Sequence, residues 1–144
     1  MKSLLKELRK LNLPEGEFAV FGSGPVAIRG IRPAGDLDLI VTPAVWDFLL
    51  KRGYKIEETD WDFTDADGKK FNYHREFIPI GSIEVWRKWS FLSDEAKELI
   101  KNADILNGIR FVKLEKVLEW KKAFNRPKDQ EDIKLIEKFL NEGH

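Results

Sequence analysis

Two aspartates stand at the start of an apolar run, and they constrain the fold more than any other feature of the sequence. The segment "DLDLIV" (residues 36–41) alternates as a strand does, so Asp36 and Asp38 share one face while Leu37 and Leu39 share the other. Carboxylates about 7 Å apart on one face repel each other, and burying them ionised costs several kcal/mol unless positive charge meets them. The positive charge is either a bound metal ion or a basic side chain, with Asp36 then capping a turn and Asp38 pairing with an arginine.

The composition narrows the choice of metal and of location. The chain of 144 residues has no cysteine and two histidines, which excludes disulfides and cysteine-bound zinc and argues against a multi-histidine site. A metal here is expected to be a hard cation held by oxygen, such as Mg²⁺, Mn²⁺ or Ca²⁺. The length suits one domain, residues 1–144. No apolar run reaches the roughly 20 residues of a membrane span and no signal peptide is recognisable, so a cytoplasmic protein without a membrane partner is expected.

A turn rich in glycine precedes the strand that carries the aspartates. The segment "EFAVFG" (residues 17–22) predicts a strand that stops at Gly22, and a short helix is expected from Pro25 to Gly30. Open backbone amides at Gly22 and Ser23, ahead of a helix, suit the oxygens of a phosphate group. An ordinary connection between a strand and a helix has the same composition. The turn and the carboxylate pair are separated by 12 residues, and together they favour the phosphate interpretation.

The rest of the chain predicts an α/β (α+β) fold, a mixed sheet flanked by helices with a helical pair at the C-terminus. Further helices are expected at residues 2–12, 42–53, 93–102, 113–124 and 129–141. Further strands are expected at residues 54–57, 71–80 and 82–86, with a hairpin over 105–112 around Asn107-Gly108. The acidic stretch 57–67 is expected to be a solvated loop, and the basic stretch 110–128 a solvated helix face.

These motifs resemble the nucleotidyltransferase superfamily, whose fold is that of polymerase beta. Its members carry Gly-Gly or Gly-Ser after an apolar strand and then, after a short spacer, an acidic-apolar-acidic triplet, which Gly22-Ser23 and Asp36-Leu37-Asp38 match. Gly30 and Arg32 stand where small bacterial and archaeal members often have a glycine and an arginine. Ala34 replaces the usual hydroxyl residue, a departure that weakens the expected substrate contacts.

The resemblance extends to two later segments. A third carboxylate is expected on a later strand, and "SIEVW" offers Glu84, with Asp62 as its rival and an outward-facing glutamate as the plain alternative. The C-terminal pattern of Lys, five residues, Arg-x-Lys-Asp, two residues and Asp is matched by Lys121, Arg126, Lys128, Asp129 and Asp132. Lys121 is expected to assist the triphosphate, Asp129 to cap the last helix, and Asp132 to orient a base.

The resemblance implies a Mg²⁺-dependent or Mn²⁺-dependent transfer of a nucleoside monophosphate from a nucleoside triphosphate (NTP) to an acceptor hydroxyl. The implied catalytic and metal-binding residues are Asp36, Asp38 and Glu84, and the implied nucleotide-binding residues are Gly22, Ser23, Arg32 and Lys121. Two alternatives stay open: a catalytically degenerate binding module, and a toxin of a toxin–antitoxin pair that modifies tRNA or protein. The acceptor, the base preference and a protein partner (a second copy or a small helical protein) also stay open.

Overall fold

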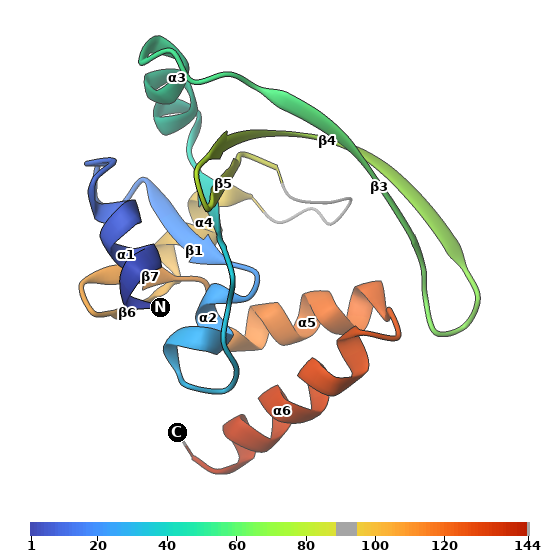
Figure 1. Ribbon diagram of the computed structural model, residues 1–144. Helices are drawn as coiled ribbons and strands as arrows, with labels where there is room; N and C mark the ends of the chain where they lie inside the picture. Colours follow the sequence, from blue (N-terminus) through green and yellow to red (C-terminus); the bar gives the residue numbers. More distant parts are fainter. Residues whose placement is uncertain (89–94, 144) are drawn as a thin grey trace.

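The computed structural model describes residues 1–88 and 95–143, and within them one mixed sheet of seven strands is flanked by helices (Figure 1). The helices are α1 (Lys2–Arg9), α2 (Gly24–Ile28), α3 (Pro43–Lys51), α4 (Ala96–Lys101), α5 (Leu114–Phe124) and α6 (Asp129–Asn141). The strands are β1 (Phe18–Phe21), β2 (Leu37–Val41), β3 (Glu57–Thr64), β4 (Lys70–Ile80), β5 (Ile83–Trp86), β6 (Asp104–Leu106) and β7 (Ile109–Phe111). The order of elements is the predicted one, which confirms a mixed α/β fold with a C-terminal helical pair.

The sheet has the order β3-β4-β5-β2-β1-β7-β6, with β2 at its centre. Strand β2 runs antiparallel to β1 and parallel to β5, while β1 runs parallel to β7. The remaining pairs, β3 with β4, β4 with β5 and β6 with β7, are antiparallel. Because β2 and β5 are adjacent and parallel, residues at matching positions on them lie side by side and point to the same face.

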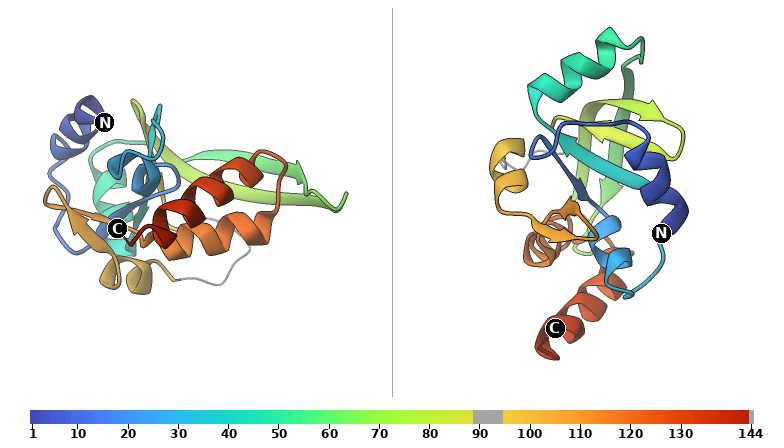
Figure 2. Two further views of the ribbon diagram at one scale, coloured as in Figure 1. Left: turned by 90° about the horizontal axis from the view of Figure 1, so that it is seen from below. Right: turned by 90° about the vertical axis from the view of Figure 1, so that its left-hand side faces the viewer.

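Helices cover both faces of the sheet, so the apolar side chains form a core on each side. Leu37 and Leu39 of β2 pack with apolar residues of α1 and α3 on one face. Ile40 of β2 and Trp86 of β5 pack with residues of α4 and α5 on the other. Helix α6 joins a third cluster through Ile136, which packs with α2 and α5. Helices α5 and α6 lie side by side beneath the sheet (Figure 2).

Local sequence signals explain several of these boundaries. Thr42 caps α3 by accepting a hydrogen bond from the backbone N–H of Val45, and Pro43 occupies the first turn, as predicted. Asn107 and Gly108 both adopt positive φ, at 54° and 74°, which suits the tight turn between β6 and β7. Among the helices of residues 1–88 and 95–143, none has the length and apolar composition that crossing a membrane requires.

The prediction for the acidic stretch was wrong. Residues 57–67 are not a solvated loop, because Glu57–Thr64 form the whole of β3, and the strand predicted at 54–57 overlaps it only at its last residue. Trp61 and Phe63 alternate with acidic residues, so one face of β3 is apolar and the other is charged. The predicted helix at 93–102 corresponds to α4, and the first two of its residues lie outside the described part of the chain.

Strands β3 and β4 form a long hairpin that curves from the sheet toward the junction of α5 and α6 (Figure 1). The tip of the hairpin contacts that junction at Asn125. The backbone N–H of Ala66 donates to the Asn125 carbonyl at 2.6 Å, and the Asn125 side chain donates to Asp67 at 3.2 Å. Asn125 has a left-handed φ of 51° and ends α5. The hairpin and the helical pair therefore enclose the sheet face that carries Asp38.

Candidate active site

The predicted carboxylates lie on one face of two neighbouring strands. Asp38 of β2 pairs directly with Glu84 of β5 in the parallel register, so their side chains leave the sheet side by side. Asp36 lies just before β2, two residues from Asp38, and is exposed. Leu37, between them, is fully buried on the opposite face. The alternative candidate for the third carboxylate, Asp62, is hydrogen-bonded to Asn72 and lies on β3, the edge strand that β4 separates from β5.

The carboxylates destabilise each other's charged forms. Burial, together with the charges of Glu84 and Asp36, raises the pKa of Asp38 to about 7, although the hydrogen bond from the Trp86 indole and the charge of Arg75 act to lower it. Trp86 Nε1 donates to Asp38 Oδ1 at 3.1 Å. Burial, together with the charge of Asp36, also raises the pKa of Glu84. The face therefore holds excess negative charge, which is the condition that a cation would relieve.

The turn after β1 fits against Asp38. Gly22 has a φ of +66°, and a Cβ at this position would lie 2.7 Å from Asp38 Oδ2. A side chain at position 22 is therefore disfavoured both by the backbone conformation and by the carboxylate. Ser23 precedes α2, and its hydroxyl accepts a hydrogen bond from Arg32 Nη2 at 3.0 Å. Both predicted residues of the turn thus adjoin a charged side chain of the site.

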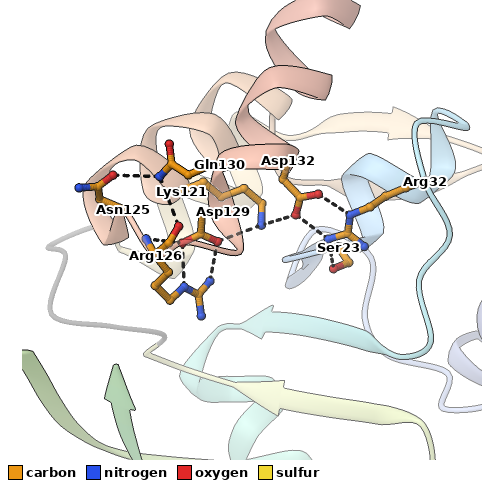
Figure 3. Close-up of polar contacts among 8 residues, drawn as sticks. All are labelled: Ser23, Arg32, Lys121, Asn125, Arg126, Asp129, Gln130 and Asp132. Atoms are coloured by element: carbon orange, nitrogen blue, oxygen red, sulfur yellow. Dashed lines mark hydrogen bonds and ion pairs between the residues drawn. The ribbon is translucent and has the colours of Figure 1, made fainter. Parts of the chain in front are cut away.

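Lys121 and Arg126 of the predicted C-terminal pattern, together with Arg32, form a chain of ion pairs with two aspartates (Figure 3). Arg32 donates to Asp132 through Nε at 2.6 Å and through Nη2 at 2.8 Å. Lys121 Nζ lies 2.9 Å from Asp132 and 3.7 Å from Asp129, and Arg126 makes a two-pronged contact with Asp129 at 2.7 and 2.9 Å. The prediction of a solvated basic face is wrong for Lys121, whose side chain is only 12% exposed.

The two aspartates have different roles in this chain. Asp132 joins the loop before β2 to α5. Burial opposes its ionisation, but the bonds from Arg32 and Lys121 outweigh it and hold the pKa of Asp132 below its usual value. Asp129 is almost fully buried and accepts from the backbone N–H of Arg126. The prediction that Asp129 caps α6 is wrong in detail, because Lys128 occupies the cap position and Asp129 is the first helical residue.

One cavity of about 440 Å³ brings most of the predicted residues together. Its wall includes Gly22, Ser23 and Asp38 on the sheet side, and Arg32 beside them. The facing wall comes from α5 and α6 and includes Lys121. Asp36 and Glu84 are not part of this wall. A separate cavity of about 360 Å³ between α4 and α5 contains none of the predicted site residues.

The type of donor atoms agrees with the metal-binding prediction, but the arrangement of the side chains does not. Three carboxylates and no nitrogen or sulfur donors form the set that Mg²⁺ prefers. As the side chains stand, however, residues 1–88 and 95–143 contain no group of three acidic or histidine side chains placed to hold a metal ion. The donor chemistry and the excess negative charge fit a divalent cation, while the present arrangement is not a complete coordination site.

Sequence reasoning missed a basic residue near the carboxylates, Arg75, which is not part of the cavity wall. Arg75 of β4 lies with its guanidinium 4.6 Å from the centre of the Trp86 ring, and Trp86 in turn bonds Asp38. The charges of Asp38 and Glu84 both act on Arg75. A signal was available: in "FNYHREF" the alternate positions are Phe71, Tyr73, Arg75 and Phe77, so an arginine interrupts an aromatic face.

The chain was compared with protein-family models, with curated proteins and with solved structures, and none of the three comparisons gave a match.

Proposed function

We propose that this protein is a Mg²⁺-dependent nucleotidyltransferase that moves a nucleoside monophosphate from an NTP to an acceptor hydroxyl. One observation carries the proposal. Gly22, Asp38 and Lys121, which come from motifs far apart in the sequence, border a single cavity of about 440 Å³. A phosphate-binding turn, a carboxylate and a buried lysine around one cavity are the parts that phosphoryl transfer uses.

The triphosphate would bind between the turn and the helical pair. Arg32 and Lys121 already hold the oxygens of a carboxylate, Asp132, at 2.6–2.9 Å. Phosphate oxygens can accept from the same donors, and lysine and arginine are common phosphate ligands. The backbone amides after Gly22 would add donors for the phosphates. The binding energy of the triphosphate thus depends on basic groups that the fold holds in place before the ligand arrives.

The carboxylates would serve the chemical step. Asp36, Asp38 and Glu84 would hold the divalent cation, which when bound would neutralise phosphate charge and lower the pKa of the acceptor hydroxyl. The acceptor oxygen attacks the α-phosphorus, the bond to the leaving pyrophosphate breaks, and the acceptor proton passes to a carboxylate. Glu84 suits this last task because burial and the charge of Asp36 raise its pKa toward the working range of a general base.

The proposed reaction takes place in the cytoplasm, where Mg²⁺ and NTPs are available. The acceptor is a small molecule, a tRNA or a protein, and the last two would make the protein a toxin-type enzyme. A test is incubation with each α-labelled NTP and Mg²⁺, with water, glycerol or bulk tRNA as acceptor. We expect transfer of the labelled nucleoside monophosphate to the acceptor with release of unlabelled pyrophosphate, and the double substitution Asp36→Asn with Asp38→Asn should abolish both. Asp47→Asn, at an exposed position of α3, is the matched control and should retain full activity.

One observation favours the alternative of a binding module without catalysis. In the described residues the carboxylates do not form a ready metal-binding group, and Lys121 is neutralised by Asp129 and Asp132. A module of this kind would bind the triphosphate without releasing pyrophosphate. A rise in melting temperature with NTP, equal in the presence and absence of Mg²⁺ and without pyrophosphate release, would favour the module over the enzyme.

A further inference from the structure

Two arginines and three aromatic rings form a continuous stack on the face of the sheet that carries Asp38. We call it the aromatic–arginine column, made of Phe77, Trp86, Arg75, Trp61 and Arg126. Phe77 stacks on Trp86 at 4.9 Å between ring centres. The Arg75 guanidinium lies 4.6 Å from the Trp86 ring and 4.4 Å from the Trp61 ring. The Arg126 guanidinium lies 5.2 Å from the Trp61 ring. The column thus runs from Phe77 of β4 and Trp86 of β5 to Arg126, at the junction of α5 and α6.

The register of the sheet places Arg75 on the carboxylate face. Pro79 of β4 pairs with Glu84, and Arg75, four residues earlier, points to the same face as Pro79. The Trp86 ring beneath Arg75 donates its N–H to Asp38. A single aromatic ring therefore links the guanidinium to the carboxylate. The charges of Asp38 and Glu84 reach Arg75 strongly enough to oppose the effect of its burial.

Holding Arg75 in this position has an energetic cost. Burial lowers the pKa of Arg75 to about 10, so the guanidinium remains charged at neutral pH but is less stable there than in water. Two tryptophan faces, at 4.4 and 4.6 Å, hold the planar group in one orientation. Contacts of this kind stabilise a cation through the negative face of the aromatic ring. A desolvated cation in a fixed orientation is the arrangement that stabilises charge developing during a reaction.

We infer that Arg75 is a catalytic residue of the proposed transfer, whose guanidinium binds the phosphoryl group in transit between the NTP and the acceptor. The inference rests on the proposed function. As the acceptor oxygen forms its bond to the α-phosphorus, the bond to pyrophosphate breaks and the leaving group takes the electron pair. Negative charge on the non-bridging oxygens of the α-phosphate is then held by the N–H groups of Arg75.

The column explains why an arginine rather than a lysine stands at position 75. A guanidinium stacks on two rings through its flat faces and still directs N–H groups from its edge, whereas an ammonium has no flat face. Lysine at this position would keep the charge and lose the orientation. A purely structural Arg75 would be needed for stability alone, and then its replacement would change the melting temperature without changing turnover.

The test compares Arg75→Lys with a matched substitution outside the site. Arg87 lies 4.9 Å from the ring of Trp46, which packs on the opposite face of the sheet, so Arg87→Lys alters the same kind of contact away from the carboxylates. Pyrophosphate release is measured for both variants with Mg²⁺, the four common NTPs, and water, glycerol or bulk tRNA as acceptor. Binding of a non-hydrolysable ATP analogue and thermal melting are measured on the same preparations. We expect Arg75→Lys to lower kcat about 100-fold and to change KM less than about threefold, since it removes an interaction made in the transition state.

A second variant keeps the test decisive if Arg75→Lys does not fold. Trp61→Phe preserves an aromatic contact but reduces the surface on which Arg75 rests, and it should lower kcat about tenfold with the same analogue affinity. Arg75→Lys turnover equal to that of Arg87→Lys overturns the inference and leaves the proposed function intact. A raised KM with unchanged kcat also overturns it. A wild-type protein that neither binds the analogue nor releases pyrophosphate overturns the proposed function, and the inference with it.

Discussion

Replacing Asp38 with asparagine should make the protein more stable at neutral and alkaline pH. Asparagine has nearly the same shape and keeps an oxygen that can accept the hydrogen bond from Trp86 Nε1. It removes a charge whose neighbours, Glu84 and Asp36, oppose it. A group needed for chemistry but costly to folding is common in active sites. The stability of this variant therefore tests the electrostatic description of the site without requiring a substrate.

The magnitude follows from the pKa of Asp38. The value rises from 3.8 to about 7 on folding, chiefly through burial. At about 1.4 kcal/mol for each pKa unit, the ionised carboxylate costs the folded state at most about 4 kcal/mol. Side-chain movement and water entry reduce such costs, so we expect Asp38→Asn to raise the free energy of unfolding by about 2–4 kcal/mol near pH 8.

The sign of the pH dependence follows from the direction in which folding shifts the pKa of Asp38, which is upward. Below about pH 4 the folded and unfolded wild-type chains both carry the proton, so the variant and the wild type should be nearly equal. Between about pH 4 and pH 7 the unfolded chain loses the proton first, and wild-type stability falls relative to the variant. Above about pH 7 both forms are ionised and the difference is constant.

The measurement is urea unfolding of both proteins at intervals across this pH range. Asp47→Asn is the control, because Asp47 is exposed on α3, and its effect should stay within about 0.5 kcal/mol. A variant no more stable than the wild type near pH 8 would refute the argument, as would an advantage that does not shrink toward acid. Mg²⁺ with a non-hydrolysable ATP analogue should then stabilise the wild type more than the variant.

Three further predictions address other parts of the site. Gly22→Ala should lower the free energy of unfolding, measured in urea, by about 1–3 kcal/mol, because it adds a Cβ 2.7 Å from Asp38 Oδ2 at a φ of +66°. Gly53→Ala is the control: Gly53 also has a positive φ but has open space around it, so its free energy of unfolding should fall less. Lys121→Ala should weaken binding of a non-hydrolysable ATP analogue by about 1.5–3 kcal/mol in isothermal titration, whereas Lys122→Ala, at an exposed neighbour paired with Glu137, should leave the affinity unchanged. Ala66→Pro removes the N–H that the hairpin tip donates to Asn125, and should speed amide hydrogen exchange at residues 67–69 while exchange in the centre of β4 stays slow.

Much of the fold was predictable because local signals agree with the tertiary structure. The cap at Thr42, the turn at Asn107-Gly108 and the alternation of residues 36–41 each specify a boundary without distant contacts. The exception was β3, where acidic residues indicated a loop. Its charged face is solvated, but Trp61 and Phe63 face the end of α5 and pack on Phe124. Pairing with a strand that follows later in the chain, and burial by a still later helix, are not local properties.

Only the residues of the candidate site that belong to recognisable sequence motifs were predictable. Gly22, Ser23 and Asp38 are close in sequence, and their proximity in space follows from β1 pairing with β2. Lys121 was assigned by resemblance, and its contact with Asp132 is a detail of how α5 packs against α6. Arg75 was missed because its role depends on a hairpin register. That register alone brings β4 beside β5 and places the guanidinium over Trp86.

The unliganded site keeps its opposite charges in two separate groups, and this separation has a consequence for binding. The carboxylates at Asp38 and Glu84 face each other with raised pKa values, while Arg32 and Lys121 are neutralised by Asp132. A triphosphate alone would be attracted by Arg32 and Lys121 but repelled by the carboxylates. A divalent cation alone would reduce the repulsion between the carboxylates but would make no favourable contact with the basic side chains. A triphosphate that carries its own Mg²⁺ satisfies both at once. We therefore expect the metal–nucleotide complex to bind better than either component alone. Arg75, which lies beside Trp86 near the carboxylates, has a pKa of about 10 and stays charged at neutral pH.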